Sequence, residues 1–256
     1  MIGPLPWIGG KRRIAKRLVA LLPPHQTYVE PFCGGAQVFF HKEPSPVEVL
    51  NDLDGELVNF LRVCQLHHPE LVRFLQYSVP SRSWFAWYEG QDPATLTDVQ
   101  RAARFFYLQK NSFAGRIHGR NFHYAVEKPS NYNGSRFPAL LAAVAERLNR
   151  VQIESWPYEK VIERYDRPGT LFYIDPPYVS APWYRFNFVD SDFQLLADRL
   201  STIKGRFLLS INDCELSREA FAGFHAQEIS FAYTSTRSVP TVRELLFSNY
   251  PLPTAP

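Results

Sequence analysis

The segment TLFYIDPPY, residues 170–178, is the most informative part of the sequence for the fold. Its first five residues are apolar, aromatic or β-branched, which is typical of a buried strand, and the strand ends in Asp175. Pro176 and Pro177 hold φ at about −65° and have no N–H, so the backbone here presents carbonyl acceptors without a competing donor. Acceptors on a rigid frame indicate a binding site for an NH2 group.

Tyr178 adds an aromatic face beside these acceptors. Stacking of a heteroaromatic base on such a ring contributes about 1 to 3 kcal/mol. Two acceptors that draw the hydrogens of a ring amine out of the ring plane localise its lone pair and stabilise the positive charge that develops during attack. The alternative is a Pro-Pro turn with a capping Asp175 and a packed Tyr178.

Other β-rich runs alternate with amphipathic segments, which predicts an α/β sheet with helices packed on it. These runs are residues 27–32, 47–52, 151–156, 206–213, 227–233 and 244–250. In a parallel sheet, ligands bind beyond the carboxyl ends of the strands. We therefore expect the residues that follow the strands to share one crevice.

The glycine-rich turn EPFCGG follows the first strand, and its glycines let the backbone approach a ligand closely. Asp52 ends the second strand about twenty residues later, where an acid can accept hydrogen bonds from both hydroxyls of a ribose. Either Asp52 or Asp54 can cap the helix that follows. We favour Asp52 for the ribose and Asp54 for the cap, and we expect Asp175, Gly34 and Asp52 to face the same crevice.

Residues 53–150 separate the second strand from the third, far more than one crossover helix needs. We expect an insertion at 67–136, with 1–66 and 137–256 forming the main domain. The insertion is predicted to be helical as far as Leu108, with an aromatic core of Trp84, Phe85, Trp87, Phe105, Phe106 and Tyr107. Its remainder is rich in Gly, Asn and Ser, which suggests a β-hairpin and exposed loops.

No Asp or Glu occurs from Val99 to Val126, a stretch that holds five Lys or Arg residues. Such a segment suits contacts to phosphates, with Arg or Asn side chains reading base edges. The candidates for DNA contact are Asn111, Arg116, Arg120 and Asn121. The alternative for each is an ordinary solvated loop.

Composition excludes several classes. The chain has 256 residues, is 45% hydrophobic and carries a net charge of +3. Its three cysteines have no CxxC spacing, so we expect neither disulfides nor a metal site. No apolar run approaches membrane-spanning length, and the basic N-terminal region is unlike a secretory signal, so we expect a cytoplasmic protein with no membrane partner. The lack of a complete G-x-G-x-x-G disfavours a nicotinamide oxidoreductase.

With PWIGGK at 6–11, EPFCGG at 30–35, LND at 50–52 and DPPY at 175–178, the chain resembles the D12 class of N6-adenine DNA methyltransferases. The resemblance covers nearly the whole chain, with a looser match in the insertion. It implies a class I S-adenosylmethionine-dependent methyltransferase (Rossmann-like) sheet with an antiparallel final strand and an inserted, mainly helical target-recognition domain. It also implies S-adenosyl-L-methionine as methyl donor, no metal, and double-stranded DNA whose target adenine is flipped out to stack on Tyr178.

The resemblance also assigns roles to residues. The donor would be bound by Trp7, Lys11, Glu30, Phe32, Gly34, Asp52 and Asp175, and the catalytic loop would be Asp175, Pro176, Pro177 and Tyr178. Trp7 and Lys11 would line the methionine end, with Lys11 meeting the donor's carboxylate. The chain departs from the family's F-x-G-x-G pattern because Ala36 replaces the last glycine. If that position needs a positive φ, Ala36 is strained by about 1 kcal/mol.

The same residues also fit other functions. A methyltransferase-fold protein that binds DNA without catalysis, or an amino-methyltransferase that acts on RNA, cytosine N4 or a protein amide, fits the same loop. The family interpretation adds a cognate restriction enzyme as a possible partner, a monomer or weak dimer, and a bacterial cell or phage-infected host.

Overall fold

The computed structural model describes residues 1, 3–124, 130–181, 183–232 and 241–253. Within them lies a seven-stranded sheet in the order β3-β2-β1-β4-β5-β7-β6. The strands are β1 (Thr27–Glu30), β2 (Val47–Asn51), β3 (Gln152–Glu154), β4 (Thr170–Ile174), β5 (Arg206–Asn212), β6 (His225–Ala232) and β7 (Thr241–Ser248). The pairs among β1 to β5 are parallel, whereas β7 runs antiparallel to β5 and β6. The predicted Rossmann-like sheet with an antiparallel final strand is confirmed.

Helices cover both faces of the sheet because side chains alternate between the faces along each strand. On one face, Tyr28 and Leu171 pack with α1 (Ala15–Ala20) and α2 (Gln37–His41). On the other, Val29 and Phe172 pack with α7 (Tyr158–Tyr165), α8 (Asp190–Ser201) and the segment around α9 (Glu215–Ala220). The central strands are therefore buried on both sides, and only their ends are open to ligands.

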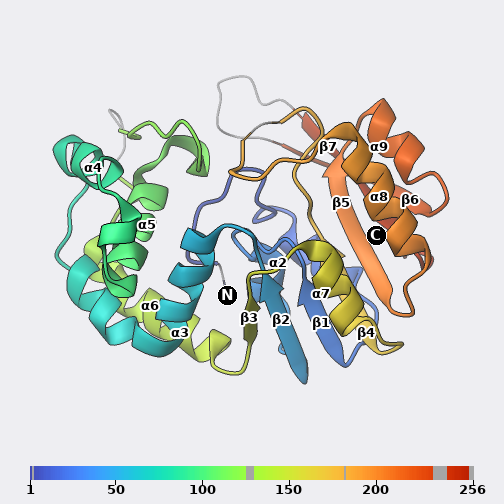
Figure 1. The fold of residues 1–256 in the computed structure, drawn as a ribbon, viewed down its shortest axis with the longest axis horizontal. Helices are drawn as coiled ribbons and strands as arrows, with labels where there is room; N and C mark the ends of the chain where they lie inside the picture. Colours follow the sequence, from blue (N-terminus) through green and yellow to red (C-terminus); the bar gives the residue numbers. More distant parts are fainter. Residues whose placement is uncertain (2, 125–129, 182, 233–240, 254–256) are drawn as a thin grey trace.

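The chain between β2 and β3 forms a helical unit beside the sheet (Figure 1). Its elements are α3 (Gly55–Leu75), α4 (Arg82–Glu89), η1 (Pro93–Thr95), α5 (Asp98–Asn111), η2 (Phe113–Gly115), η3 (Gly134–Arg136) and α6 (Phe137–Leu148). Helix α3 continues through residue 67, where the helix is kinked two residues before Pro69. The unit shares one core with its face of the sheet, and the division at 67–136 stays a prediction.

The predicted aromatic core of this unit is confirmed in part. The rings of Phe105 and Phe106 pack on Phe60 of α3 at 6.0 and 5.7 Å between centroids. Trp84 and Trp87 are instead 46% and 60% exposed, because α4 is a short peripheral helix with only Phe85 buried. The predicted hairpin lies partly outside the described residues, and the part of 109–136 that the structure describes contains one isolated antiparallel bridge, between Ser112 and Phe122.

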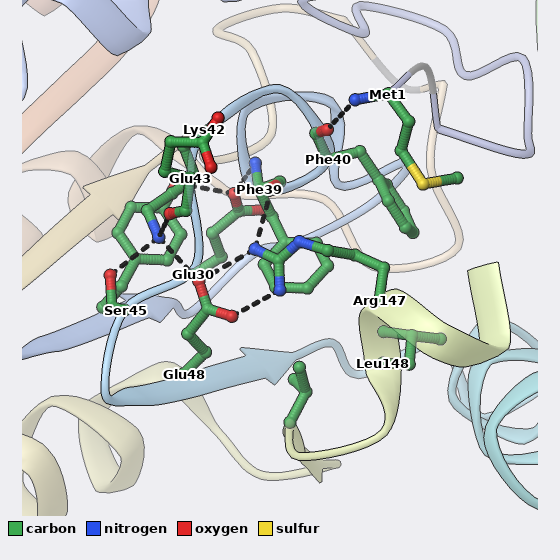
Figure 2. Close-up of polar contacts among 12 residues, drawn as sticks. Met1, Glu30, Phe39, Phe40, Lys42, Glu43, Ser45, Glu48, Arg147 and Leu148 are labelled. Carbon is green, nitrogen blue, oxygen red and sulfur yellow. Dashed lines mark hydrogen bonds and ion pairs between the residues drawn. The ribbon is translucent and has the colours of Figure 1, made fainter. Parts of the chain in front are cut away.

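An ion cluster anchors the end of this unit to the sheet (Figure 2). The guanidinium of Arg147, in α6, donates to both carboxylate oxygens of Glu48 in β2, at 2.5 and 2.9 Å, and to the carbonyl of Phe39. Lys42 Nζ donates to the same carboxylate at 2.6 Å. Two cations and one buried acid thus join α6, β2 and the end of α2.

The turn before α2 confirms that the backbone at Ala36 has a positive φ. This residue has φ 47° and ψ 39°, the left-handed conformation, and it precedes the first residue of α2. Its side chain is buried. A non-glycine residue is strained in this region, because Cβ crowds the following carbonyl oxygen.

We expect Ala36→Gly to raise the free energy of unfolding by up to about 1 kcal/mol, because glycine adopts this conformation without the strain. Urea unfolding followed by circular dichroism measures the change. Ala197→Gly, in the interior of α8, is the matched control and should lower stability by about 1 kcal/mol. Equal destabilisation by both substitutions would show that Ala36 is not strained.

Candidate active site

A cavity of about 550 Å³ lies beyond the carboxyl ends of β1, β2 and β4. Gly34 from the turn after β1, Asp52 from the end of β2 and Asp175 from the end of β4 all line it. Trp7 and Lys11 of the N-terminal segment line it as well. The structure therefore brings together groups that lie up to 168 residues apart in the chain, from Trp7 to Asp175.

Asp52 is tied to the glycine turn. Its Oδ2 accepts from the backbone N–H of Gly34 at 3.0 Å, and its Oδ1 accepts from Asp54 N at 2.9 Å. Burial raises the pKa of Asp52 to about 6, against these backbone hydrogen bonds. Asp54 caps α3 through Glu56 N at 3.0 Å, which confirms the predicted cap.

The turn has no room for a side chain at Gly34. It has φ 45°, and a Cβ here would lie 2.6 Å from Nε1 of Trp7. The indole therefore packs directly on the turn. Phe32, two residues earlier, lines the cavity and packs against the rings of Tyr158 and Phe188, at 5.1 and 5.6 Å between centroids.

Glu30 ends β1 and lies at the floor of the cavity, almost fully buried. Its Oε1 accepts from the hydroxyl of Tyr28 at 2.7 Å and from Phe39 N at 2.9 Å. Burial raises the pKa of Glu30 to about 8, although both hydrogen bonds oppose the shift. Figure 2 shows this carboxyl beside the Arg147 cluster, so the floor of the cavity and the anchor of α6 share one region.

Lys11 lies against the DPPY loop. Its ammonium donates to Asp175 Oδ1 at 2.5 Å, to the hydroxyl of Tyr178 at 2.8 Å and to the carbonyl of Gly9 at 3.0 Å. An ammonium has three N–H donors, so these bonds use all of them. A contact of Lys11 with a donor carboxylate would have to replace one of these bonds, and that role stays a prediction.

Asp175 is the centre of this loop. Its Oδ1 also faces Ser210 Oγ of β5 at 3.4 Å. Burial raises the pKa of Asp175 to about 6, Lys11 lowers it, and Glu244 of β7 raises it further. The carboxyl is therefore mostly ionised at pH 7 and above.

Of the other three residues of the DPPY loop, only one lines the cavity. Pro177 lines the cavity, whereas Pro176 and Tyr178 lie behind its wall. The ring of Tyr178 is only 9% exposed, and its hydroxyl donates to Glu244 Oε1. Stacking of a base on this ring stays a prediction. Sequence reasoning missed Glu244, although an acid at the start of the apolar run ELLF was a usable signal.

The four candidate DNA contacts divide into two pairs. Arg116 and Asn121 are exposed. Arg120 packs over the ring of Phe105 at 5.7 Å, and burial lowers its pKa to about 10. Asn111 is 2% exposed and donates to the carbonyl of Tyr107 at 2.9 Å, so in this conformation it presents nothing to DNA.

The acid-free segment nevertheless reaches the cavity. Ile117, next to Arg116, is one of the lining residues. Gly115 has φ 68°, and a Cβ there would lie 2.8 Å from the carbonyl carbon of Pro6. Gln109 Nε2 donates to the carbonyls of Pro6 and Gly115 at 2.9 and 2.6 Å. The segment thus packs on PWIGGK.

The described residues show neither a metal-binding cluster nor a membrane-spanning helix. They contain no group of three or more His, Cys, Asp or Glu residues that could hold a metal ion. None of the helices they form is long and apolar enough to cross a membrane.

The strand order and the glycine turn facing Asp175 define a methyltransferase of the Rossmann-like class. The family model described as D12 class N6 adenine-specific DNA methyltransferase matches residues 7–234. The chain belongs to this family of enzymes.

Curated relatives match along most of their length. The chain is 26% identical to the type II methyltransferase M1.LlaDCHI of Lactococcus lactis subsp. cremoris, covering 95% of this chain and 94% of that protein. It is 25% identical to M.CviBI of Paramecium bursaria Chlorella virus NC1A, covering 89% of each. A DNA adenine methylase of Salmonella typhi is 26% identical over 84% of this chain and 82% of its own length.

A solved structure, a putative methyltransferase from Streptococcus mutans in complex with SAH, matches at a TM-score of 0.38 and 8% identity. It covers 91% of this chain and 94% of that chain. The fold class rests instead on the strand order and its antiparallel β7.

Glu30 should make stability depend on pH. An acid whose pKa is higher in the folded state binds more protons there, so stability falls as pH rises from its ordinary value of 4.5 towards about 8. We expect Glu30→Gln to remove this slope, of up to about 1.4 kcal/mol per pH unit. Urea unfolding at pH 5, 6.5 and 8 tests it, with Glu163→Gln on the exposed side of α7 as control. Parallel slopes for wild type and Glu30→Gln would contradict the assignment.

Proposed function

We propose that this protein transfers a methyl group from S-adenosyl-L-methionine to the N6 amine of an adenine that is flipped out of double-stranded DNA. The observation that carries the proposal is the position of the Asp175 carboxylate, which lines the same cavity as the glycine turn and Asp52. Family membership supports adenine in DNA as the substrate.

The residues of the cavity suit the methyl donor. Its volume lies in the range of small-ligand sites. The half-buried carboxylate of Asp52 can accept hydrogen bonds from ribose hydroxyls, Gly34 allows close approach of the backbone, and Phe32 and Trp7 supply apolar walls. When bound, the donor supplies an electrophilic methyl group on a sulfonium sulfur. The chain's own task is to hold the amine in line with that carbon.

Asp175 is suited to hold the amine. All of its hydrogen bonds with the described residues fall on Oδ1, and its side chain is 22% exposed. Above pH 6 the carboxyl is mainly ionised and acts only as an acceptor. Together with a carbonyl of the Pro176–Pro177 frame it can bind both hydrogens of N6, which favours the pyramidal amine that attacks.

DNA binding is proposed for the acid-free segment around Arg116 and Asn121. Both side chains are exposed, and Ile117 between them lines the cavity. Arg185, half-exposed at the same cavity, adds a cation. Since a base stacked in a duplex cannot reach Asp175, the adenine must leave the helix. Asn111 is not part of this surface because it is buried, and Arg120, packed over Phe105, supports it from below.

The biological setting follows from the relatives' names. Two of them are called type II methyltransferases, which supports a role beside a restriction enzyme of the same sequence specificity. The relative from Salmonella typhi is called a DNA adenine methylase, a name that mentions no type, so a role without a restriction enzyme is equally compatible with the relatives. In both cases we expect action as a monomer or weak dimer in the cytoplasm of a bacterium or a phage-infected host.

We expect Asp175→Ala to reduce methyl transfer at least about 1,000-fold, because the amine loses its charged acceptor. Incubation of DNA with labelled donor, followed by mass analysis of nucleosides, measures N6-methyladenine and separates it from N4-methylcytosine and methylated RNA. Asp175→Asn is the isosteric comparison: it also loses the charge that pairs with Lys11, and its NH2 group donates where an acceptor is needed, so it should be nearly inactive as well. Full activity in Asp175→Ala would contradict the role.

We expect Arg116→Ala to weaken DNA binding by about tenfold or less and to flatten its salt dependence, with little change in donor binding. Fluorescence anisotropy with a labelled duplex and calorimetry with the donor measure the two affinities. Arg164→Ala, on the exposed side of α7, is the matched control. An equal loss of both affinities in Arg116→Ala would remove the segment from the recognition role.

A further inference from the structure

Glu244 is a buried acid in the interior of the sheet. It lies in β7, paired with Asn212 of β5 on one side and with Ile229 of β6 on the other, and it is 2% exposed. A carboxylate in such a place costs free energy unless it is paired and hydrogen-bonded. The side chains that contact Glu244 therefore indicate its role.

Those partners belong to the catalytic loop and to the N-terminal segment. Glu244 Oε1 accepts the hydrogen bond of the Tyr178 hydroxyl and lies 3.8 Å from Lys11 Nζ. Its Oε2 is buried without a hydrogen-bond partner among the described residues. Glu244 is not among the residues that line the cavity, so we infer that it acts through these two side chains.

The charges in this cluster do not balance. Lys11 is one cation between two acids, Asp175 at 2.5 Å and Glu244 at 3.8 Å. Asp175 is faced by Lys11 and Ser210, which contact its carboxylate, and by Glu244, which lies near Lys11. The acid Glu30 and the phenols Tyr173 and Tyr178 also act on it electrostatically. The second acid competes for Lys11 and opposes ionisation of Asp175.

We propose that Glu244 is a positioning residue for the methyl transfer: it fixes the ring of Tyr178 through the phenol and shares Lys11 with Asp175, so that the DPPY loop has one geometry. The proposal rests on the function proposed above. Among the described residues, the Tyr178 hydroxyl is hydrogen-bonded to Lys11 and Glu244, which come from two distant parts of the chain. Removal of either leaves the phenol with one contact and frees the loop to shift.

The test compares Glu244→Ala, Glu244→Gln and Tyr178→Phe with wild type. A misplacement of about 1 Å at a reacting group costs about 100-fold in rate. We therefore expect Glu244→Ala to lower kcat by about 10- to 100-fold while KM for the donor changes less than about threefold. Gln keeps an oxygen that accepts from Tyr178, so Glu244→Gln should restore most of kcat. Glu228→Gln, exposed on the adjacent strand β6, is the control and should match wild type.

The pH profile separates positioning from a merely structural role. In wild type, kcat should fall as pH drops through about 6, where Asp175 takes up its proton. Glu244→Gln removes a negative charge near Asp175, which stabilises the ionised carboxylate, so this acidic limb should move to lower pH. In the double variant with Tyr178→Phe, the effect of Glu244→Ala should be less than additive.

An acidic limb that stays in place in Glu244→Gln would overturn the proposal. So would a loss in Glu244→Ala that equals the unfolded fraction seen by circular dichroism. If wild type forms no N6-methyladenine, the proposed function itself fails. If wild type is active and the Glu244 variants match Glu228→Gln, only the positioning role fails.

Discussion

The buried contact of Lys11 with Asp175 and Tyr178 is the interaction on which the rest of the site depends. It joins residues 164 and 167 positions apart and ties the N-terminal segment to the end of β4. Removal of one partner from a buried ion pair destabilises the folded protein by about 3 to 5 kcal/mol, because the other charge stays buried. The segment before α1 is therefore part of the proposed catalytic centre, although it lies outside the sheet. Glu244 of β7 is a second acid beside the ammonium of Lys11. On the proposal above, the geometry of the DPPY loop therefore depends on the N-terminal segment, the end of β4 and β7.

A second constraint is close packing across the cavity. Trp7 fills the space over Gly34, and Pro6 fills the space over Gly115, so the same hexapeptide touches the glycine turn and the acid-free segment. Protein interiors are packed too densely for one of these surfaces to move alone. The segment around Arg116, which we propose to contact DNA, therefore belongs to a surface that is continuous with the turn proposed for the donor. The ion cluster at Arg147 anchors the other end of the helical unit to β2.

Local patterns were enough for much of this architecture. Every predicted strand region contains a strand, the Asp54 cap is present, and Ala36 has the positive φ that its place in the glycine pattern required. These features depend on neighbours within a few residues, where hydrophobic period and capping chemistry act directly. Trp84 and Trp87 were predicted to be buried and are not, because residue type alone does not say which face of α4 meets a partner.

The class of the sheet, the order of its motifs and the residues at its strand ends could be predicted from the amino-acid sequence, because alternation and turn chemistry depend on neighbouring residues and parallel strands place their carboxyl ends together. The contacts of those residues became known only from the three-dimensional structure. It turned Lys11 towards Asp175, buried Asn111 against the carbonyl of Tyr107, left Arg116 exposed and placed Glu244 beneath Tyr178. Burial and pairing depend on groups from distant parts of the chain, and no local pattern specifies which of these groups meet in space.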